Sequence, residues 1–299
     1  MARIGGTLLS DEDAAFPAHW TVFADLPPLL YVRGRWPHQL TPWPPAAIAI
    51  VGSRRADAAA CAFAFDLAAA AARAGVTVVS GLAYGIDAAA HRGALSAGAR
   101  AAPTVAVVAG GVDRPGPAGN LALARSIVAS GGAVVAEAPL GSSPSKGDFP
   151  RRNRLIAALA RAVVVVAAGA ASGAHRTAGH AAAYGRDVFV VAARPWDEAY
   201  AGNLALLRDG ALPVYGLEDA LQALAIAASP TAVASPGCDR PHVPDRLHWL
   251  WTLLSSTPEP VETLVERGGR GVGATLAGLE ALVDARLCSV DGARRYRRR

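Results

Sequence analysis

Between residues 46 and 215 the chain alternates short apolar runs with longer alanine-rich segments. The runs have the length of strands, and they are continuous in Val, Ile and Ala rather than interrupted by polar residues. Continuous apolar strands are typical of a sheet that is buried on both faces. The expected strands are 47–52, 76–81, 104–111, 133–138, 162–168, 187–193 and 212–215.

The segments between these runs have the length of helices. Most of them close on a glycine, which commonly follows the last residue of a helix. The strict alternation of strand and helix predicts the α/β class, with a doubly wound, mostly parallel, Rossmann-like sheet. The expected helices are 56–74, 86–97, 120–129, 155–161, 177–184, 203–208 and 217–226.

The two ends of the chain break this pattern. Residues 1–45 hold two proline clusters around a strand-like LLYVRG run, which predicts a short lead-in strand and a linker. Residues 46–226 make up the expected Rossmann-like domain, and residues 227–244, with four prolines, a second linker. Residues 245–299 contain three helical segments and a hairpin with an Asp-Gly turn, the outline of a small winged-helix-like domain.

Composition narrows the function classes without choosing one. Hydrophobic residues make up 52% of the 299 residues and charged residues 18%, so a sizeable core is available. The formal net charge of +5 weakly favours a polyanionic partner. The three cysteines are scattered, so no disulfide framework or zinc site is indicated. We find no signal peptide and no apolar stretch long enough to span a bilayer, and we expect a cytoplasmic protein.

The most informative stretch is 141–159, GSSPSKGDFPRRNRLIAAL. It starts as a Gly/Ser/Pro loop, turns basic at Lys146, presents Phe149, and continues through a run of arginines into an apolar segment. This pattern predicts a polar loop that leads into a helix whose first turn carries positive charge. An anion bound there would meet both the backbone amides and the guanidinium groups. The alternative interpretation is a solvated basic turn.

In a doubly wound sheet, ligands bind outside the carboxyl ends of the strands. The strand at 47–52 is followed by Ser53, Arg54 and Arg55, which offer donors for an anion at a helix start. Gly52 permits a close backbone approach. The segment lacks the GxGxxG pattern, which disfavours a dinucleotide site.

Two other strand ends allow both a chemical and a structural interpretation. Asp87 and His91 would share a helix face and could form a catalytic dyad, but a capping aspartate with a helix–loop hydrogen bond is the more ordinary interpretation. Ser172, Gly173 and Thr177 could touch a phosphate, but we favour helix capping. We therefore predict no catalytic residues, no metal and no cofactor.

The predicted rim of the sheet combines glycines, small hydroxyls, cations and one aromatic ring. The sequence shows no P-loop, no GxSxG elbow and no close pair of acids. Such a rim is typical of a surface for single-stranded nucleic acid, where cations neutralise phosphates and bases stack on an aromatic face. The rim residues that we predict to bind DNA are Gly52, Ser53, Arg54, Arg55, Gly81, Gly110, Lys146, Phe149, Arg151, Arg152 and Arg154.

Seven motifs occur in the order seen in the DprA/Smf family, the DNA-processing proteins of natural transformation. They are VGSRRA, SGLAYGIDAAAH, GGVDRPGPAGN, EAPLG, FPRRNRLIAALA, SGAHRTAGHAAAYGRDVFVV and GNLALLRDGA. The resemblance covers about residues 26–215, and the C-terminal unit resembles the family's winged-helix-like domain. It implies a homodimer that binds single-stranded DNA and loads the RecA recombinase, without catalytic activity. It also implies a DNA pocket made of Gly52, Ser53, Arg54, Lys146, Phe149, Arg152, Asn153 and Arg154.

The chain departs from the family pattern at several positions. Ala167 stands where a glutamate is expected, and Ala192-Ala193 stand where Pro-Gly is expected. The loop expected to read GxDxxYP runs from Gly111 to Pro117 without the tyrosine. The family's helical N-terminal domain has only a short counterpart in this sequence.

Two further interpretations stay open. Nucleotide phosphoribohydrolases of the lysine-decarboxylase-like group have a related fold, but they use the glutamate of a PGGxGTxxE motif. The closest stretch here, SGAHRTAGH, has no acid. The other interpretation is a scaffold that has lost DNA binding, which the presence of Arg54, Lys146 and Arg154 disfavours.

Overall fold

The computed structural model describes residues 1, 5–41, 45–221, 247–254, 259–284, 288–291 and 295–298. The chain falls into two compact units, Met1–Val233 and Ala234–Arg299. The predicted linker 227–244 and the end of the predicted helix 217–226 lie outside the described residues. The domain limits at 46, 226 and 245 therefore stay predictions.

The larger unit is built on one nine-stranded sheet with the order β1-β2-β6-β5-β4-β3-β7-β8-β9. From β6 to β9 every neighbouring pair is parallel, while β2 joins β6 and β1 joins β2 in antiparallel fashion. The strands are β1 (Gly6–Ser10), β2 (Leu29–Gly34), β3 (Ala47–Val51), β4 (Thr77–Ser80), β5 (Thr104–Val107), β6 (Ala133–Ala136), β7 (Ala162–Val165), β8 (Asp187–Val191) and β9 (Leu212–Val214). The predicted doubly wound, mostly parallel sheet is confirmed.

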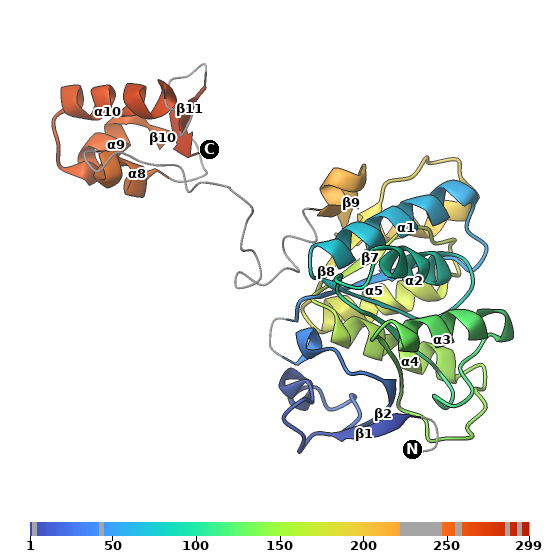
Figure 1. Cartoon of the computed structure of the whole chain (residues 1–299). Helices are drawn as coiled ribbons and strands as arrows, with labels where there is room; N and C mark the ends of the chain where they lie inside the picture. The colour runs from blue at the N-terminus through green and yellow to red at the C-terminus, as the bar shows by residue number, and fades with distance from the viewer. Residues whose placement is uncertain are drawn as a thin grey trace. The chain divides into compact units, whose positions relative to one another are not determined.

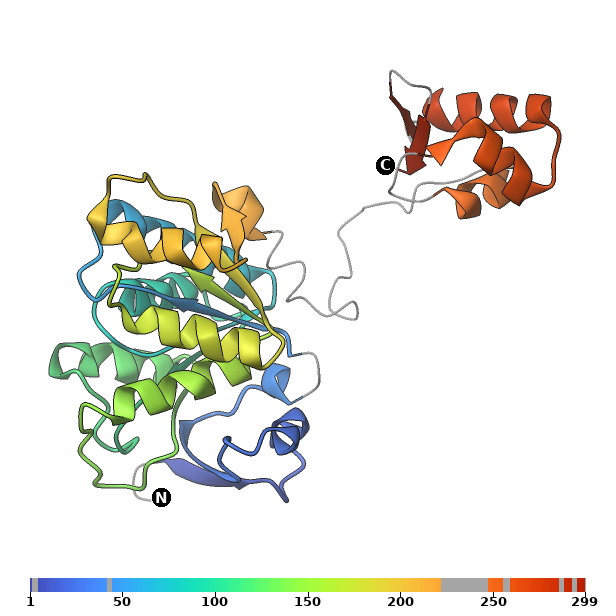
Figure 2. The ribbon, with the colours of Figure 1, turned by 180° about the vertical axis from the view of Figure 1, so that it is seen from behind.

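Helices cover both faces of this sheet. Figure 1 shows α1 (Ala58–Arg73), α2 (Ile86–Ser96) and α3 (Leu121–Ala129) on one face. Figure 2 shows α4 (Asp148–Leu159) and α5 (Gly173–Ala183) on the other. α6 (Ala201–Arg208) packs into the same core cluster as α4 and α5. All residues of the central strand β3 are buried, as the continuous apolar run predicts.

Three of the predicted helices begin earlier than expected, α6 by only two residues. α4 begins at Asp148 instead of residue 155, because the Asp148 carboxylate accepts hydrogen bonds from the amide and hydroxyl of Ser145, as in a capping box. Pro150 is tolerated in the first turn, where a backbone N–H has no helical partner. α5 begins at Gly173 instead of residue 177. The corrections to α4 and α5 move candidate site residues from loops into the first turns of helices.

The N-terminal segment is more ordered than its proline clusters suggest. The predicted lead-in strand is β2, and β1, which the sequence analysis did not predict, pairs with it at one edge of the sheet. Trp20, 2% exposed, packs in the core beneath α4 and donates a hydrogen bond from Nε1 to the Ala158 carbonyl at 3.3 Å. The segment is therefore part of the sheet and its core.

The smaller unit has its own core and its own sheet. It contains α8 (His248–Leu253), α9 (Val261–Gly268) and α10 (Val272–Asp284), and a sheet of the order β10 (Glu259–Pro260), β12 (Arg295–Arg298), β11 (Cys288–Val290). The three helices and the antiparallel β11–β12 pair match the predicted elements, and β10 adds a strand that was not predicted. The winged-helix-like class stays a prediction. Within the described residues, no helix is both long and apolar enough to cross a membrane.

Candidate nucleic-acid interface

The order of the strands reverses at the centre of the sheet, between β3 and β7. The chain leaves β3 toward α1 on one face and leaves β7 toward α5 on the other. In open α/β sheets, the crevice outside the carboxyl ends at this switch point is the usual ligand site. A groove of about 690 Å³ lies there, walled by the loop after β3, the first turns of α4 and the start of α5. We call it the switch-point groove.

Most of the predicted DNA-binding residues come together in this groove. The structure places eight of them on its wall, namely Gly52, Ser53, Arg54, Arg55, Lys146, Phe149, Arg152 and Asn153. These residues lie on two segments nearly a hundred positions apart in the sequence. The parallel order of β3 and the neighbouring strands is what brings the segments to one edge.

The remaining four predicted residues lie elsewhere. Gly81 and Gly110 line an adjoining slot of about 210 Å³. Arg151 lines a third cavity of about 190 Å³, and Arg154 is buried, with only 9% of its side chain exposed. Arg152 is buried as well, so the expectation of one rim that presents every predicted cation is wrong for Arg152 and Arg154.

The loop after β3 is fixed by the neighbouring strand end. The Ser53 amide donates a hydrogen bond to the Ala167 carbonyl at 2.6 Å, and the Ser53 hydroxyl oxygen accepts one from the Arg55 amide at 3.1 Å. A Cβ on Gly52 would lie 2.7 Å from the Ala167 carbonyl oxygen and 2.7 Å from the Ile86 side chain. Gly52 therefore allows this loop to pack closely against the Ala167 carbonyl and the Ile86 side chain. The Ser53 amide already donates its hydrogen bond to Ala167.

The anion site expected at a helix start after β3 is not formed by that helix. α1 begins at Ala58, and Asp57 caps it by accepting a hydrogen bond from the Ala60 amide at 2.7 Å. A carboxylate thus holds the position where an anion would otherwise meet the helix dipole. The chemistry of this loop rests instead on the exposed Arg54 and Arg55 side chains.

Arg54 and Phe149 form a stacked pair at the boundary between the groove and the slot. The Arg54 guanidinium carbon lies 5.1 Å from the centroid of the half-buried Phe149 ring, in cation–π geometry. Both side chains line both cavities. Stacking holds the planar guanidinium in place while its N–H donors stay free to meet an anion.

Arg152 has a structural role that the sequence analysis did not anticipate. It is buried, and its Nη1 donates a hydrogen bond to the Val107 carbonyl at 2.5 Å. The side chain passes over Gly81, where a Cβ would lie 2.0 Å from Nη1. Burial lowers the pKa of Arg152 to about 10, and the nearby Asp87 carboxylate opposes this shift, so the guanidinium stays charged at neutral pH. Arg152 therefore ties α4 to the ends of β4 and β5.

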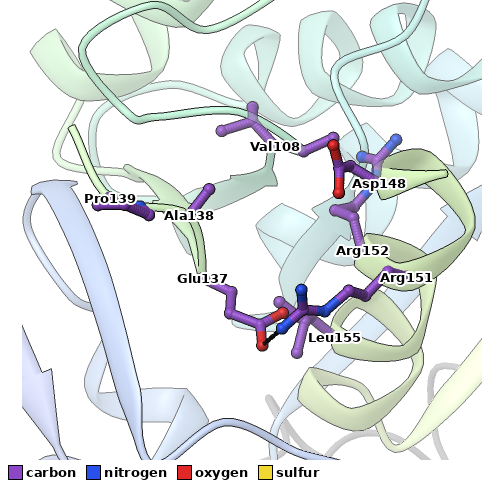
Figure 3. A pocket seen from close by; sticks show the side chains of 9 residues that line it. Val108, Glu137, Ala138, Pro139, Asp148, Arg151, Arg152 and Leu155 are labelled. Atoms are coloured by element: carbon purple, nitrogen blue, oxygen red, sulfur yellow. Dashed lines mark hydrogen bonds and ion pairs between the residues drawn. The ribbon is translucent and has the colours of Figure 1, made fainter. Parts of the chain in front are cut away.

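One carboxylate neutralises the two remaining arginines of the motif. Glu137, directly after β6, accepts a hydrogen bond from Arg151 at 2.5 Å and another from Arg154 at 2.7 Å. Figure 3 shows the Arg151 side chain extending across the third cavity to Glu137. Paired cations offer less to an external phosphate than free ones, so these two arginines hold α4 against β6.

One cation of the groove was missed in the sequence. Arg176 is exposed on the first turn of α5 and lines the switch-point groove. Ser172 caps this helix by accepting a hydrogen bond from the Ala174 amide at 3.3 Å, which confirms the favoured capping role. Arg176 belongs to the motif SGAHRT. Its place on the first turn of α5 follows from the start of this helix at Gly173, four residues earlier than predicted.

Asp87 and His91 do not form a dyad. Asp87 accepts hydrogen bonds from the amides of Gly81 and Ala83, at 3.1 and 3.3 Å. The His91 Nδ1 lies 2.8 Å from the Thr104 hydroxyl, and complete burial lowers the pKa of His91 to about 3. The predicted helix–loop hydrogen bond is confirmed, but Asp87 lies inside the first turn of α2, whose N-cap is Gly85, so the capping role is wrong. In the described ranges, no cluster of three or more His, Cys, Asp or Glu side chains could hold a metal ion.

Fold and groove together define a class of protein: a Rossmann-like α/β protein with a cationic groove at the switch point of its sheet. The chain belongs to the DNA recombination-mediator protein A family, whose sequence model matches residues 7–225. This finding confirms the resemblance to the DprA/Smf proteins.

Relatives from several bacteria support this membership. The chain is 42% identical over 233 residues to a putative DNA processing protein DprA of Mycobacterium tuberculosis, covering 74% of this chain and 58% of that protein. It therefore spans little more than half the length of this relative. It is 31% identical over 271 residues to the Smf protein of Escherichia coli, covering 89% of this chain and 70% of that protein.

Two solved structures share the fold. DprA from Streptococcus pneumoniae aligns with a TM-score of 0.64 at 32% identity, over 74% of this chain and 76% of that one. DprA from Helicobacter pylori aligns with a TM-score of 0.65 at 27% identity, over 75% of this chain and 97% of that one. The description of the H. pylori structure refers to a single-stranded DNA binding mode.

Proposed function

We propose that this protein binds single-stranded DNA in the switch-point groove and acts in DNA recombination and natural transformation, as its family membership implies. The observation that carries the proposal is a set of exposed cations around a stacking ring. Within the described part of the chain, no ion pair neutralises Arg54, Arg55, Lys146 or Arg176.

The groove suits a phosphate backbone. Four cations from three segments face one hollow, and the N-terminus of α5 opens at its edge. Phosphate contacts of this kind supply most of the sequence-independent affinity for nucleic acid. The helix dipole favours negative charge at the same place.

The adjoining slot suits an unpaired base. Its lining includes Tyr84, Pro117, Pro144 and Phe149, which offer ring faces and flat apolar edges. At Gly110 a Cβ would lie 2.8 Å from the Pro144 ring, so the glycine keeps the slot walls close together. Because a paired base cannot leave its stack to enter such a slot, we expect single strands to bind better than duplex.

Two partners follow from the family resemblance and are proposed on that basis. The first is a second copy of this chain, supported by exposed apolar side chains at and after the edge strand β9. They are Leu212, Tyr215, Leu217 and Leu221. The second is the RecA recombinase, for which no surface is assigned. Sedimentation analysis of the purified protein measures the first, and a RecA strand-loading assay measures the second.

The phosphoribohydrolase alternative has no structural observation in its favour. Of the described residues that line the switch-point groove, Asp87 is the one carboxylate. Both of its backbone hydrogen bonds hold the loop after β4, and it is buried. We therefore do not propose this activity.

The decisive experiment is a salt titration of binding to a single-stranded oligonucleotide and to a duplex of equal length. Arg54→Ala should weaken single-strand binding by about 1–3 kcal/mol and reduce the salt slope by about 0.7, because one phosphate contact is lost. Phe149→Ala should cost a similar free energy and leave the slope nearly unchanged, because stacking releases no counterions.

The matched control is Arg73→Ala. Arg73 is exposed on the last turn of α1, at the opposite end of the sheet from the groove, and its removal lowers the net charge by the same amount. The affinity of the Arg73→Ala variant for single-stranded DNA should equal that of the wild type. Equal losses for Arg54→Ala and Arg73→Ala, or no single-strand binding by the wild type, would contradict the proposal.

A further inference from the structure

A second basic groove lies beyond the slot, on the α3 side of the sheet. It has a volume of about 530 Å³ and is bounded by β2, the loop after β5 and α3. Three arginines line it: Arg33 from β2, Arg114 from the loop and Arg125 from α3. Only the loop residues belong to a motif named in the sequence analysis. We call it the α3 groove.

The charge in the α3 groove is not balanced by the residues that line it. Asp113 is the one carboxylate among them. Both of its oxygens accept hydrogen bonds from the Gly141 amide, at 3.0 and 3.1 Å, and one lies 3.9 Å from Arg114 Nε. Three guanidinium groups therefore face one carboxylate that already has a backbone partner.

Arg33 shows the imbalance most clearly. Its side chain is half-buried, and its Nε is buried with no hydrogen-bond partner among the described residues. Arg125 is exposed, and 71% of the Arg114 side chain is exposed. A buried donor without a partner is unfavourable, so Arg33 adds a charge that is not compensated locally beside the two exposed guanidinium groups.

The α3 groove continues the path of the other two cavities. Arg54 and Phe149 line both the switch-point groove and the slot, and Gly116 lines both the slot and the α3 groove. The path follows the carboxyl ends of β7, β3, β4 and β5 in their order in the sheet. β7 and β5 are three strand spacings apart, or about 14 Å, and the α3 groove adds to this length beyond the slot.

Gly116 stands at the junction of the slot and the α3 groove. It occupies the position of the tyrosine in the expected GxDxxYP loop. A Cβ there would meet no atom within 4 Å, so the site is open space. The absence of a side chain leaves the passage between the two cavities clear.

We propose that a single DNA strand bound in the switch-point groove continues over the slot into the α3 groove, where Arg33, Arg114 and Arg125 bind its phosphates. This inference rests on the proposed function and extends it. It assigns a second set of phosphate contacts and a longer bound segment than the switch-point groove holds. A phosphodiester strand fits because it presents one anion per nucleotide along a continuous path.

The test is the dependence of affinity on strand length. Binding of oligothymidylates from about 4 to about 20 nucleotides is measured for the wild type and for the double variant Arg114→Ala/Arg125→Ala. The two curves should coincide for the shortest strands. For the longest strands the variant should bind about 10-fold more weakly, with a salt slope reduced by about 1.4, because two phosphate contacts are lost.

Each result has a defined meaning. Curves that coincide at every length, or that differ by the same factor at every length, overturn the inference and leave the proposed function intact. A wild type that binds no strand of any length overturns both. A double variant of the same charge, Arg73→Ala/Arg161→Ala, has both substitutions outside the lining of the two grooves and should follow the wild-type curve throughout.

Discussion

At the scale of single residues, His91 shows how burial creates a dependence of stability on pH. Its Nδ1 lies 2.8 Å from the Thr104 hydroxyl, which itself donates to the Val78 carbonyl at 2.7 Å, so the Nδ1 carries the proton in this network. The side chain is fully buried and has a pKa of about 3. The folded protein therefore holds the neutral imidazole, while the unfolded chain takes up a proton below about pH 6.5.

Acidification should consequently destabilise the larger unit. Between about pH 6.5 and pH 3 the unfolded state binds more protons at His91 than the folded state, so the free energy of unfolding falls by up to about 1.4 kcal/mol per pH unit. His91→Gln should reduce this dependence, because glutamine does not titrate, while His19, whose pKa burial lowers to about 4, keeps its own contribution. Urea unfolding of both proteins at pH 5 and pH 7.5 measures the free energy of unfolding at each pH. An equal change between the two pH values in the wild type and the variant would contradict the neutral, buried state of His91.

The residue scale is also where the sequence predicted least about the site. The pattern pointed to basic residues near this edge of the sheet but missed Arg176, and charge alone cannot tell a free guanidinium from a paired one. Glu137 lies 14 positions before Arg151 and directly follows β6, whereas Arg151 lies on α4. The pairing of Glu137 with two arginines therefore depends on tertiary contacts. Arg176 was overlooked because its importance depends on where α5 begins.

At the scale of elements, the position of α4 depends on one glycine in another loop. Arg152 crosses from α4 to the Val107 carbonyl only because Gly81 has no side chain. Asn153 adds a second tie, from its Nδ2 to the Gly173 carbonyl at 3.2 Å. These contacts set the first turns of α4, and with them the place of Phe149.

Gly81→Ala should displace Arg152 and lower the stability of the larger unit by about 1–3 kcal/mol, because a buried carbonyl loses its partner. Arg152→Met should cost a similar amount. The double variant should cost much less than the sum of the two, since both remove the same contact. Urea denaturation of the three variants measures this coupling, and additive losses would show that Gly81 and Arg152 act independently.

Strands were easier to predict than the starts of helices. A strand buried on both faces leaves an unbroken apolar run, and every predicted strand of the larger unit is present. The start of α4 is set instead by the Asp148 carboxylate reaching back to Ser145, in a segment rich in charge and proline. Such local polar contacts produce no hydrophobic period for a sequence pattern to show.

At the scale of the whole molecule, the two compact units have separate cores. The core of the smaller unit centres on Leu250, Leu264, Leu279 and Leu282, none of which belongs to the core clusters of the sheet. We expect the units to unfold as separate transitions, since cooperativity depends on a shared core.

Leu264→Ala removes a fully buried side chain from the smaller core and should destabilise that unit by about 2–4 kcal/mol. Calorimetry should show one transition shifted to lower temperature and the other unchanged, with single-strand affinity equal to that of the wild type. A single transition that shifts as a whole would show that the two units unfold together.

The edge strand β9 has a consequence for how copies of the molecule can associate. It is three residues long, and Pro213 at its centre has no backbone N–H. A strand of this kind cannot offer a continuous ladder of main-chain donors to an additional strand from another molecule. A second copy that met this edge would therefore do so through side chains such as Tyr215, and the edge does not support the endless sheet extension that leads to fibres.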